Sequence, residues 1–378
     1  MKKLLLISLQ KYGGGAIDAL EFSNGLIENK FFHYILISEG NELREKFIEN
    51  EFRKVLMVKT FSSNYFSFFL NTFLFFKWIK LIKILFKIKP EIIHITHFHI
   101  WSIFIFILRP FLRYKIFYAV HDNPFEPKEE PALFINFFEK IFCKKSDIVL
   151  VYSNFMKESL KKYLANKKIY VLPLGVYCDL CSNLIKEFNL NKNYLDVLFF
   201  GRLEEYKGID ILVKAFEILK KEGFKINLII AGRGNINKYL QNKIKELKIN
   251  FKNYWISNKE LCKLINETDI LISPYKKGTQ SGIISTALAY GIPIIATNVG
   301  SFNEYIKDNE SGFLINPNPI ELADKIKIFY KDRNLILKFS KKSLEIAKNF
   351  QWVNITKKAI EIYNTQCLST KKFVIIKK

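Results

Sequence analysis

Short apolar runs rich in β-branched residues alternate along this chain with longer stretches in which apolar residues recur every three or four positions. A short continuous or alternating apolar run indicates a strand, and a 3.6-residue period indicates a helix. In the first half the strand-like runs lie at residues 4–9, 33–38, 91–96, 115–120 and 147–153, and a helical stretch at 16–29 follows the first of them. This order predicts parallel βαβ units.

The pattern is interrupted at residues 169–180, where IYVLPLGVYCDL contains Pro173 and Gly175 and loses its periodicity. We place a domain boundary there, because such segments form interdomain passages. Strand-like runs resume at 196–201, 226–232, 269–274 and 292–297, with a helical stretch at 209–223. The sequence therefore predicts an α/β fold with two Rossmann-like domains, residues 1–175 and 176–350, facing each other across a cleft that is the expected site.

Two apolar segments could be mistaken for membrane or export signals. The first, MKKLLLISLQKYGGG, has an apolar run too short for a signal peptide and is predicted to be the first strand. The second, residues 65–86, contains lysines that are costly at a bilayer centre. As a helix it would carry lysines on one face and apolar residues on another: Lys77, Lys80, Lys83 and Lys87; Phe75, Ile79, Ile82 and Phe86. Such a helix suits a membrane surface, or its apolar face packs on its own domain.

The composition adds a strong positive charge. Lys and Arg number 59 against 36 Asp and Glu, a formal net charge of +23, which favours a phosphorylated substrate, an anionic lipid surface or a nucleic acid as partner. The 36 Phe and 18 Tyr weigh against a disordered basic protein. Cys178 and Cys181 form a CxxC with no second pair, so we expect buried or free reduced thiols rather than a zinc or redox site.

Charged residues follow one strand of the second domain. The run at 196–201 ends at Gly201, Arg202 and Lys207 follow in a turn, and Gly208 precedes the next helix. Because the carboxyl ends of parallel strands face the ligand crevice, this Arg and Lys could grip a diphosphate, the Arg as a fork and the Lys as a point charge. The alternative is two solvated charges on an exposed turn.

Two further glycine-containing segments of the second domain are open to two interpretations. Gly232 and Gly234 form a GxG that serves either dinucleotide binding or a tight turn. In GTQSGIISTALAYGIPIIAT, residues 278–297, a helix is predicted to begin at Gly282, Ile283 and Ile284. Its first N–H groups would favour an anion, aided by Gln280 and Ser281. Alternatively, Ser281 is the N-cap of an ordinary helix.

The first domain offers glycines and histidines. Gly13, Gly14 and Gly15 let the backbone approach a ligand closely, or serve only a chain reversal. His97 and His99 would point to the same side of an extended segment, so a zinc site stays an alternative, although we expect none. His121 and Asp122 follow a strand end, where a histidine could orient a polar substrate or simply shape the turn.

Taken together, these segments resemble the GT-B glycosyltransferases, in particular the large retaining family 4 group. The resemblance is carried by GRLEEYKG, LIIAGRG, SPYKKGTQSGIISTALAYGIPIIATNVGSFNEYI, VLPLGV, FQWVNITKKAIEIY, GGG and VHD, and it covers nearly the whole chain. One departure concerns the two glutamates, separated by seven residues, that the family typically has in its donor segment. Gly278 and Thr286 stand there in this sequence, although the QSG…TALAYG form resembles a branch of the same family.

The resemblance implies a retaining transfer of a sugar from a UDP- or GDP-sugar to a glycan or lipid-linked glycan. Arg202 and Lys207 would neutralise the leaving diphosphate, and His121 would contact the transferred sugar. With those two cations and a helix dipole, no metal or other cofactor is expected. The implied donor-binding residues are Gly13, Gly14, Gly15, Gly201, Gly232, Gly234, Ile256, Gln280, Ser281, Gly282, Ile283, Ile284 and Thr286, and those implied on the acceptor side are His97, His99 and Asp122.

The resemblance also implies that the final segment, residues 351–378, forms a helix and basic tail that cross back onto the first domain. The basic and aromatic residues of 60–118 suggest a lipid-linked acceptor at the inner face of the cytoplasmic membrane, as in bacterial lipopolysaccharide or capsule synthesis. The alternatives are a sugar-nucleotide 2-epimerase of the same fold, a non-catalytic scaffold, and a nucleic-acid binder. We expect no nucleic acid, because no recognised binding module is evident. The oligomeric state is left open.

Overall fold

The computed structural model describes residues 3–60, 78–126, 132–177, 181 and 186–366. The chain forms two compact units. The N-unit consists of Met1–Gly175 and Gln351–Lys378, and the C-unit consists of Val176–Phe350. These are the same residue boundaries that the interruption at Pro173–Gly175 and the final segment led us to expect.

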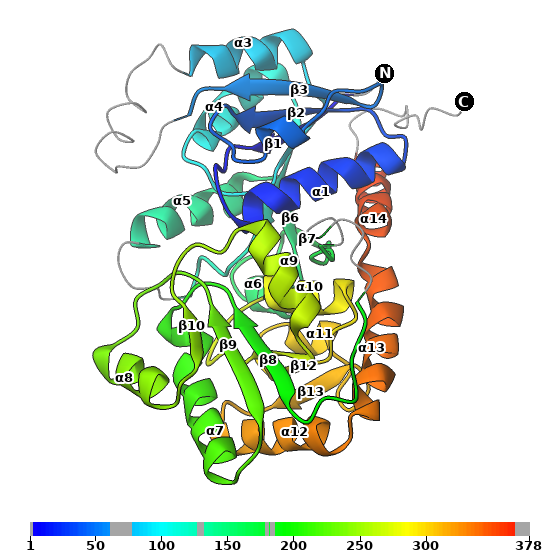
Figure 1. Ribbon diagram of the computed structural model, residues 1–378. Coiled ribbons are helices and arrows are strands. Elements are labelled where there is room, and N and C mark those ends of the chain that lie inside the picture. The colour runs from blue at the N-terminus through cyan, green and yellow to red at the C-terminus, as the bar shows by residue number, and fades with distance from the viewer. Residues whose placement is uncertain (1–2, 61–77, 127–131, 178–180, 182–185, 367–378) are drawn as a thin grey trace. The chain divides into compact units, whose positions relative to one another are not determined.

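The N-unit contains a seven-stranded parallel sheet with the order β3-β2-β1-β4-β5-β6-β7 (Figure 1). Its strands are β1 (Leu4–Ser8), β2 (His33–Ser38), β3 (Arg53–Val58), β4 (Ile92–Ile95), β5 (Lys115–Val120), β6 (Ile148–Val151) and β7 (Lys168–Val171). All residues of β1, β4 and β6 are buried, so these strands read as nearly continuous apolar runs, with Ser8 and His94 as their polar members. The prediction of a strand at the amino terminus is confirmed. The edge strands β3 and β7 were not predicted, because they mix apolar with charged or exposed residues.

Helices cover the sheet of the N-unit. They are α1 (Gly14–Glu28), the short η1 (Arg44–Lys46), α3 (Ile79–Ile88), α4 (Ser102–Leu112), α5 (Ala132–Lys145), α6 (Asn154–Lys161) and α14 (Trp352–Thr365).

The last helix, α14, returns to the N-unit and packs beside α1, as predicted (Figure 1). Gly25 allows the close approach, because a Cβ there would lie 2.7 Å from the carbonyl oxygen of Trp352. Asn29 fixes the register by donating from Nδ2 to the carbonyl oxygen of Val353 at 2.8 Å. On the sheet side, the Tyr363 hydroxyl and Nδ1 of the buried His94 on β4 are 2.6 Å apart.

The C-unit contains a six-stranded parallel sheet with the order β10-β9-β8-β11-β12-β13. Its strands are β8 (Leu195–Phe200), β9 (Ile226–Ala231), β10 (Asn250–Lys252), β11 (Ile270–Ser273), β12 (Ile294–Thr297) and β13 (Gly312–Ile315). Its helices are η3 (Glu205–Lys207), α7 (Ile209–Lys221), α8 (Lys238–Glu246), α9 (Asn258–Glu267), α10 (Gly282–Ala289), α11 (Phe302–Tyr305), α12 (Pro319–Lys331), α13 (Asn334–Ala347) and η4 (Lys348–Phe350). The edge strands β10 and β13 were not among the predicted ones.

Both sheets reverse their strand order beside their first strand. The reversal falls between β1 and β4 in the N-unit and between β8 and β11 in the C-unit. In doubly wound folds the connections that leave the carboxyl ends of two such strands diverge to opposite faces of the sheet, which leaves a crevice for ligands. The topology therefore marks one candidate site in each unit.

The expectation for Cys181 was wrong. Cys181 forms a disulfide with Cys262 of α9, 81 positions further along the chain. Among the described cysteines Cys143 is a free, buried thiol. Sequence spacing cannot reveal such a pair, because the folding of the C-unit brings the two residues together. Cys178 lies outside the described residues.

Helix α3 uses a different apolar face from the one expected for packing. Leu81, Leu85 and Ile88 are buried against the N-unit core, whereas Phe86 is 47% exposed. Phe75, Lys77 and the basic tail after residue 366 lie outside the described residues. No helix among the residues that the structure describes combines the length and the apolar character needed to span a bilayer.

Candidate functional site

The candidate site of the C-unit begins with the turn after β8. Gly201 closes this strand with a φ of 130°, and Gly208 ends the turn with a φ of 70°, values that favour glycine. A Cβ at Gly208 would lie 1.8 Å from the carbonyl oxygen of Pro274, the first residue after β11. The two connections at the strand-order reversal are therefore in direct backbone contact, and this contact positions Lys207.

Lys207 is held by a tyrosine from the other connection. Its Nζ donates to the hydroxyl of Tyr275 at 2.6 Å and lies 3.8 Å from the centre of that ring. The same hydroxyl is 2.8 Å from Oγ of Ser281. Tyr275 is 2% exposed, and burial raises its pKa, so it stays a neutral phenol. Tyr275 thus connects the ammonium group of Lys207 to the residue that precedes α10.

The start of α10 is capped by its own chain. Ser281 is the N-cap residue, and its Oγ accepts from the backbone N–H of Ile283 at 3.3 Å, which confirms the capping interpretation. Ile283 and Ile284 have buried side chains, whereas Gly282 is exposed. The Thr286 hydroxyl, 1% exposed, donates to the carbonyl oxygen of Gly282 at 2.8 Å. At this helix start the backbone therefore faces solvent at Gly282. Gln280, two positions earlier, is partly buried.

Arg202 lies on the solvent side of the same turn. Its side chain is 71% exposed and contacts Oε1 of Glu204 at 3.0 Å and the hydroxyl of Tyr206 at 3.1 Å. Nζ of Lys207 lies 4.9 Å from the ring centre of Tyr206, so both cations contact this one tyrosine. An exposed ion pair is worth about 0–1 kcal/mol, and Arg202 can therefore exchange Glu204 for a more strongly charged ligand.

Gly232 and Gly234 pack against the chain itself. A Cβ at Gly232 would lie 1.8 Å from the carbonyl oxygen of Gly201, and one at Gly234 would lie 2.2 Å from that of Leu203. These glycines thus let the turn after β9 press on the turn after β8, which agrees with their interpretation as turn residues. Ile256 is partly buried. It lies in the connection after β10, directly before Ser257, the N-cap residue of α9.

The candidate site of the N-unit begins with the glycines after β1. Gly13 has a φ of 81°, is the N-cap residue of α1 and donates its N–H to Oε1 of Glu42 at 2.8 Å. A Cβ at Gly13 or Gly14 would meet nothing within 4 Å. Gly15 differs, because a Cβ there would lie 2.5 Å from Nε2 of His97. Two of the three glycines thus face open space, and the third makes room for a histidine.

His97 and His121 form a stacked pair at the carboxyl ends of β4 and β5. Their ring centres are 3.8 Å apart, and the His121 ring lies 4.4 Å from that of Tyr152. Burial lowers the pKa of His121 to about 4 and holds the pKa of His97 well below its usual value, so both rings are neutral near pH 7. Nε2 of His121 lies 3.1 Å from the carbonyl oxygen of Thr96. Since a carbonyl only accepts, Nε2 carries the proton and Nδ1 is an acceptor.

Asp18 of α1 completes this group. Its Oδ2 lies 3.8 Å from Nε2 of His97. One potential ligand atom from each of Asp18, His97 and His121 lies within 4.8 Å of the others, a spacing that could hold a metal ion. The zinc alternative had combined His97 with His99. Instead, Nδ1 of His99 accepts from the backbone N–H of Trp101 at 3.2 Å. Asp122 is exposed beside His121.

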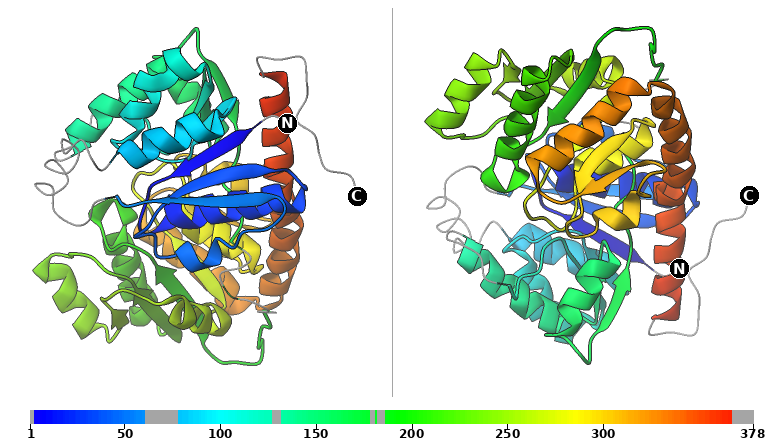
Figure 2. Two further views of the ribbon diagram at one scale, coloured as in Figure 1. Left: turned by 90° about the horizontal axis from the view of Figure 1, so that it is seen from above. Right: turned by 90° about the horizontal axis from the view of Figure 1, so that it is seen from below.

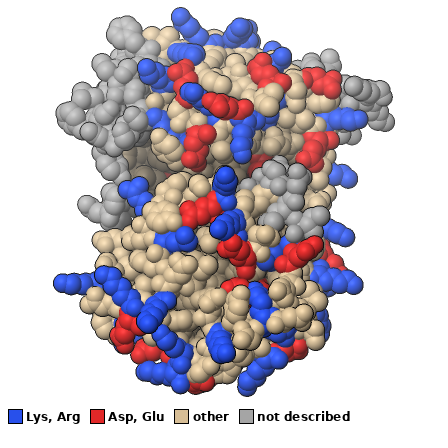
Figure 3. Space-filling model, in the orientation of Figure 1, with Lys and Arg blue, Asp and Glu red and all other residues tan. Residues whose placement is uncertain are grey.

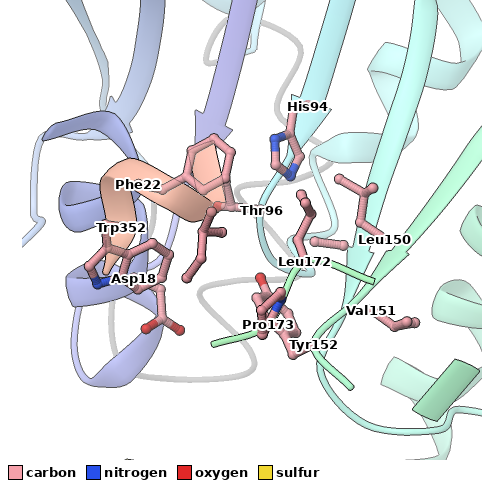
Figure 4. Close-up of a pocket in the computed structure, with 12 residues that line it drawn as sticks. Asp18, Phe22, His94, Thr96, Leu150, Val151, Tyr152, Leu172, Pro173 and Trp352 are labelled. Atoms are coloured by element: carbon pink, nitrogen blue, oxygen red, sulfur yellow. The ribbon is translucent and has the colours of Figure 1, made fainter. Parts of the chain in front are cut away.

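A small cavity in the N-unit is lined in part by Asp18 and Thr96 (Figure 4). Its volume is about 20 Å³, and it is lined from the carboxyl ends of β4, β5 and β6, from the segment after β7, and from α1 and α14. The polar residues that line it include Asp18, His94, Thr96 and Tyr152. It has room for about one water molecule and not for a sugar.

Sequence reasoning missed three residues of these groups. Tyr275, Tyr206 and Asp18 stand at ordinary positions in the sequence, after β11, within η3 and on α1. The available signal was positional for Tyr275, because it directly follows a strand that borders the strand-order reversal. Asp18 is one helical turn after Gly14, so its approach to His97 depends on how α1 packs on the sheet.

Two family models match almost the whole chain. The model described as Glycosyltransferase Family 4 matches residues 12–180, and the model described as Glycosyl transferases group 1 matches residues 182–346. An uncharacterized 41.2 kDa protein in the cps region of Klebsiella pneumoniae is 28% identical over 250 residues, which are 63% of this chain and 68% of that protein. An uncharacterized glycosyltransferase of Methanocaldococcus jannaschii is 29% identical over 175 residues, 44% of each protein.

Solved structures share the fold over nearly the full length. Sucrose-phosphate synthase from Thermosynechococcus elongatus superposes with a TM-score of 0.74 at 17% identity, covering 97% of this chain and 99% of that one. HepE from Anabaena, solved in complex with UDP-glucose, superposes with a TM-score of 0.70 at 17% identity, covering 97% and 100%. With both halves matched by family models and the architecture shared throughout, the chain belongs to the GT-B glycosyltransferases of the family 4 type and is a transferase.

Proposed function

We propose that this glycosyltransferase moves a sugar from a nucleotide-diphosphate sugar, a UDP- or GDP-sugar, to a glycan or lipid-linked glycan with retention of the anomeric configuration. One observation carries the proposal. Lys207 and Arg202, the exposed backbone of Gly282 and the hydroxyls of Tyr275 and Ser281 are grouped at the strand-order reversal of the C-unit. This combination of cations and neutral donors suits a diphosphate.

The chemical argument concerns the leaving group. When the bond between the anomeric carbon and the diphosphate breaks, negative charge develops on the phosphate oxygens. A positive charge held in place before the reaction stabilises that charge without further reorganisation, and such groups lower barriers by about 2.7–4 kcal/mol each. Lys207, fixed by Tyr275, meets this description, and Arg202 would exchange Glu204 for the phosphate. The two cations take the neutralising role that a divalent ion has in other transferases, so we propose that no metal is required.

Retention places the acceptor on the face of the sugar that the diphosphate leaves. The new bond then forms from the acceptor oxygen to the anomeric carbon as the phosphate bond breaks. The acceptor's proton passes to the departing phosphate, which becomes the base of the reaction. Gly278 and Thr286 stand where the family usually has its two glutamates, and Thr286 is buried. The ribose of the nucleotide would therefore be held by other groups.

The N-unit would supply the sugar and acceptor contacts. With Nε2 of His121 carrying the proton, Nδ1 is a hydrogen-bond acceptor, the kind of group that accepts a hydrogen bond from a sugar hydroxyl. The open backbone at Gly13 and Gly14 leaves room for a phosphate or an acceptor. His97, His99 and Asp122 lie on the proposed acceptor side. The net charge of +23 supports an acceptor carried on an anionic membrane, in surface polysaccharide synthesis at the cytoplasmic face.

Thermal unfolding in the presence of UDP, GDP and ADP, and then of their sugars, tests the proposal. A ligand that binds only the folded state at 100 times its Kd adds about 2.7 kcal/mol of stability and raises the midpoint. We expect UDP or GDP to do so, as HepE is solved with UDP, and we expect Lys207→Met to abolish the shift. No shift with any nucleotide would refute the proposal. Conversion of the donor sugar without any acceptor would instead identify the 2-epimerase.

A further inference from the structure

Three helices of the N-unit form one layer on the same side of its sheet. Figure 2 shows α3, α4 and α5 next to one another, coloured from cyan to blue-green. Trp78, the N-cap residue of α3, stacks on Phe104 of α4 with ring centres 4.3 Å apart. Phe106 of α4 stacks on Phe142 of α5 at 4.8 Å. The layer is therefore continuous, and its inner side belongs to the N-unit core.

The outer side of this layer is apolar. Eight of the 19 large hydrophobic side chains that are exposed among the described residues belong to these three helices: Phe86, Ile107, Phe111, Leu133, Phe134, Ile135, Phe137 and Ile141. Phe111 is 75% exposed and Phe137 is 59% exposed. Ile107 and Phe111 are one helical turn apart on α4, and Phe134, Phe137 and Ile141 recur at steps of three and four on α5. Exposed apolar residues gathered in this way mark an interaction surface.

The charges of the same layer are almost all positive. The three helices carry Lys80, Lys83, Lys87, Arg109, Lys140, Lys144 and Lys145. Their one acidic residue, Glu139, is 8% exposed and accepts from the hydroxyl of Tyr118 at 3.3 Å. Lys and Arg side chains also appear along the upper margin of Figure 3, where Figure 1 places α3.

A basic hollow opens where α4 ends beside α5. Its volume is about 500 Å³, and its lining includes four cations, Arg109, Arg113, Lys115 and Lys145, together with the apolar Phe106 and Pro110. Asp147 is the acidic residue of the lining and pairs with Arg109 at 2.5 Å. The hollow therefore keeps a positive excess next to the apolar side chains of α4, which suits a phosphate group attached to an acyl chain.

We infer that the outer face of α3, α4 and α5 docks on an anionic lipid bilayer. A monotopic protein buries an apolar helix face about 5–10 Å into the boundary between head groups and acyl chains, with cations at the level of the phosphates. Each Lys or Arg near an anionic surface adds to the electrostatic attraction. The absence of an exposed acidic residue on these described helices matches a surface of uniform negative charge. The inference depends on the proposed function only where it identifies the acceptor as a lipid-linked molecule. Vesicle binding is measured without turnover, so it tests the docking surface independently of catalysis.

Co-sedimentation of the full chain with vesicles tests the inference. The vesicles contain phosphatidylcholine alone, or phosphatidylcholine with 30% phosphatidylglycerol. We expect binding to the anionic vesicles, weakened by salt. We expect F111S with F137S, and separately R113E with K145E, to weaken it at least tenfold. The matched controls are Y239S with I320S and K238E with K259E, which alter exposed residues of the C-unit and should leave binding unchanged.

Several outcomes would decide against the docking surface. Binding to neutral and anionic vesicles alike, no binding at all, or equal loss in the control variants would overturn it. A concentration-dependent oligomer that F111S with F137S dissolves, without vesicle binding, would assign the face to a second copy of the chain. Circular dichroism and the UDP and GDP thermal shifts, run on every variant, separate the two proposals. Vesicle binding without any nucleotide shift would refute the proposed function and leave the docking surface standing.

Discussion

The ammonium group of Lys207 donates to the hydroxyl of Tyr275 at 2.6 Å, across the point where the strand order of the C-unit reverses. The same hydroxyl lies 2.8 Å from Ser281, the N-cap of α10. A single buried phenol therefore fixes both the cation and the helix start that would bind one diphosphate. This arrangement makes Tyr275 a positioning residue, because its effect on a ligand would pass through Lys207.

Tyr275→Phe should weaken catalysis without removing a charge. Lys207 would lose its fixed partner, so we expect kcat to fall about tenfold while the KM for the donor changes less. Leaving the buried partners unsatisfied should cost about 1–3 kcal/mol of stability. Steady-state kinetics and urea unfolding measure both. The matched control is Y330F, which removes an exposed tyrosine hydroxyl elsewhere in the C-unit, and equal kinetics in the two variants would contradict the role.

Arg202→Ala and Lys207→Met should each lower kcat/KM by about 10²–10³-fold, as removal of one charge-stabilising group does. Arg202 is 71% exposed and takes part in a weak ion pair, so its loss should leave the unfolding free energy within about 0.5 kcal/mol. The measurement is turnover of a UDP- or GDP-sugar alongside thermal unfolding. Unchanged turnover in Arg202→Ala would refute the role assigned to that residue.

Gly15→Ala and Gly14→Ala form a matched pair. A methyl group at Gly15 would lie 2.5 Å from Nε2 of His97, so the His97–His121 stack must move. We expect a loss of about 1–3 kcal/mol and lower activity. At Gly14 the methyl group would meet nothing within 4 Å, and alanine favours the helix, so stability should stay equal or rise slightly. Equal urea midpoints for the two variants would show that the close contact is not present in solution.

Stability should fall as the pH is lowered from about 6.5 towards 4. Burial lowers the pKa of His33, His99 and His121 to about 4 and that of His94 to about 3, whereas an unfolded histidine titrates near 6.5. Between these values the unfolded chain binds more protons, so the stability present above pH 6.5 is lost on acidification, by up to about 1.4 kcal/mol per histidine and pH unit.

Urea unfolding at pH 7, 6 and 5 checks this window, in which most carboxylates remain ionised. The slope should shrink when His33 is replaced by Asn, because one buried titrating group is removed. A free energy of unfolding that stays constant from pH 7 to 5 would contradict the neutral, buried state of these rings.

The Cys181–Cys262 bond should make the C-unit sensitive to reduction. It closes a loop with a sequence separation of 81, for which the chain-entropy estimate of stabilisation is about 4.5 kcal/mol. Dithiothreitol or Cys262→Ser should therefore lower the unfolding midpoint. Mass spectrometry after thiol labelling in denaturant should find Cys181 and Cys262 unlabelled unless the protein is first reduced. Five labelled cysteines without reductant would show that the bond does not form.

The predicted architecture owed its accuracy to burial. Central strands such as β1, β4, β6 and β12 have both faces covered, so each reads as a mainly apolar run. The edge strands β3, β7, β10 and β13 carry mixed residues or are short. Their positions therefore cannot be recognised from a continuous apolar run. The capping role of Ser281 was within reach of the sequence, because N-cap preference is a local property.

The return of the last helix was expected from the family resemblance. By itself, the sequence determined two α/β units, the boundary near Gly175 and the glycine-marked turns that end β1 and β8. These follow from local periodicity and from the few residues that accept a positive φ. Only the tertiary structure decided which side chains meet: Lys207 with Tyr275, Asp18 and His97 with His121, and Cys181 with Cys262. Such contacts depend on strand order and helix packing, which bring together residues up to 103 positions apart in ways that spacing along a chain does not encode.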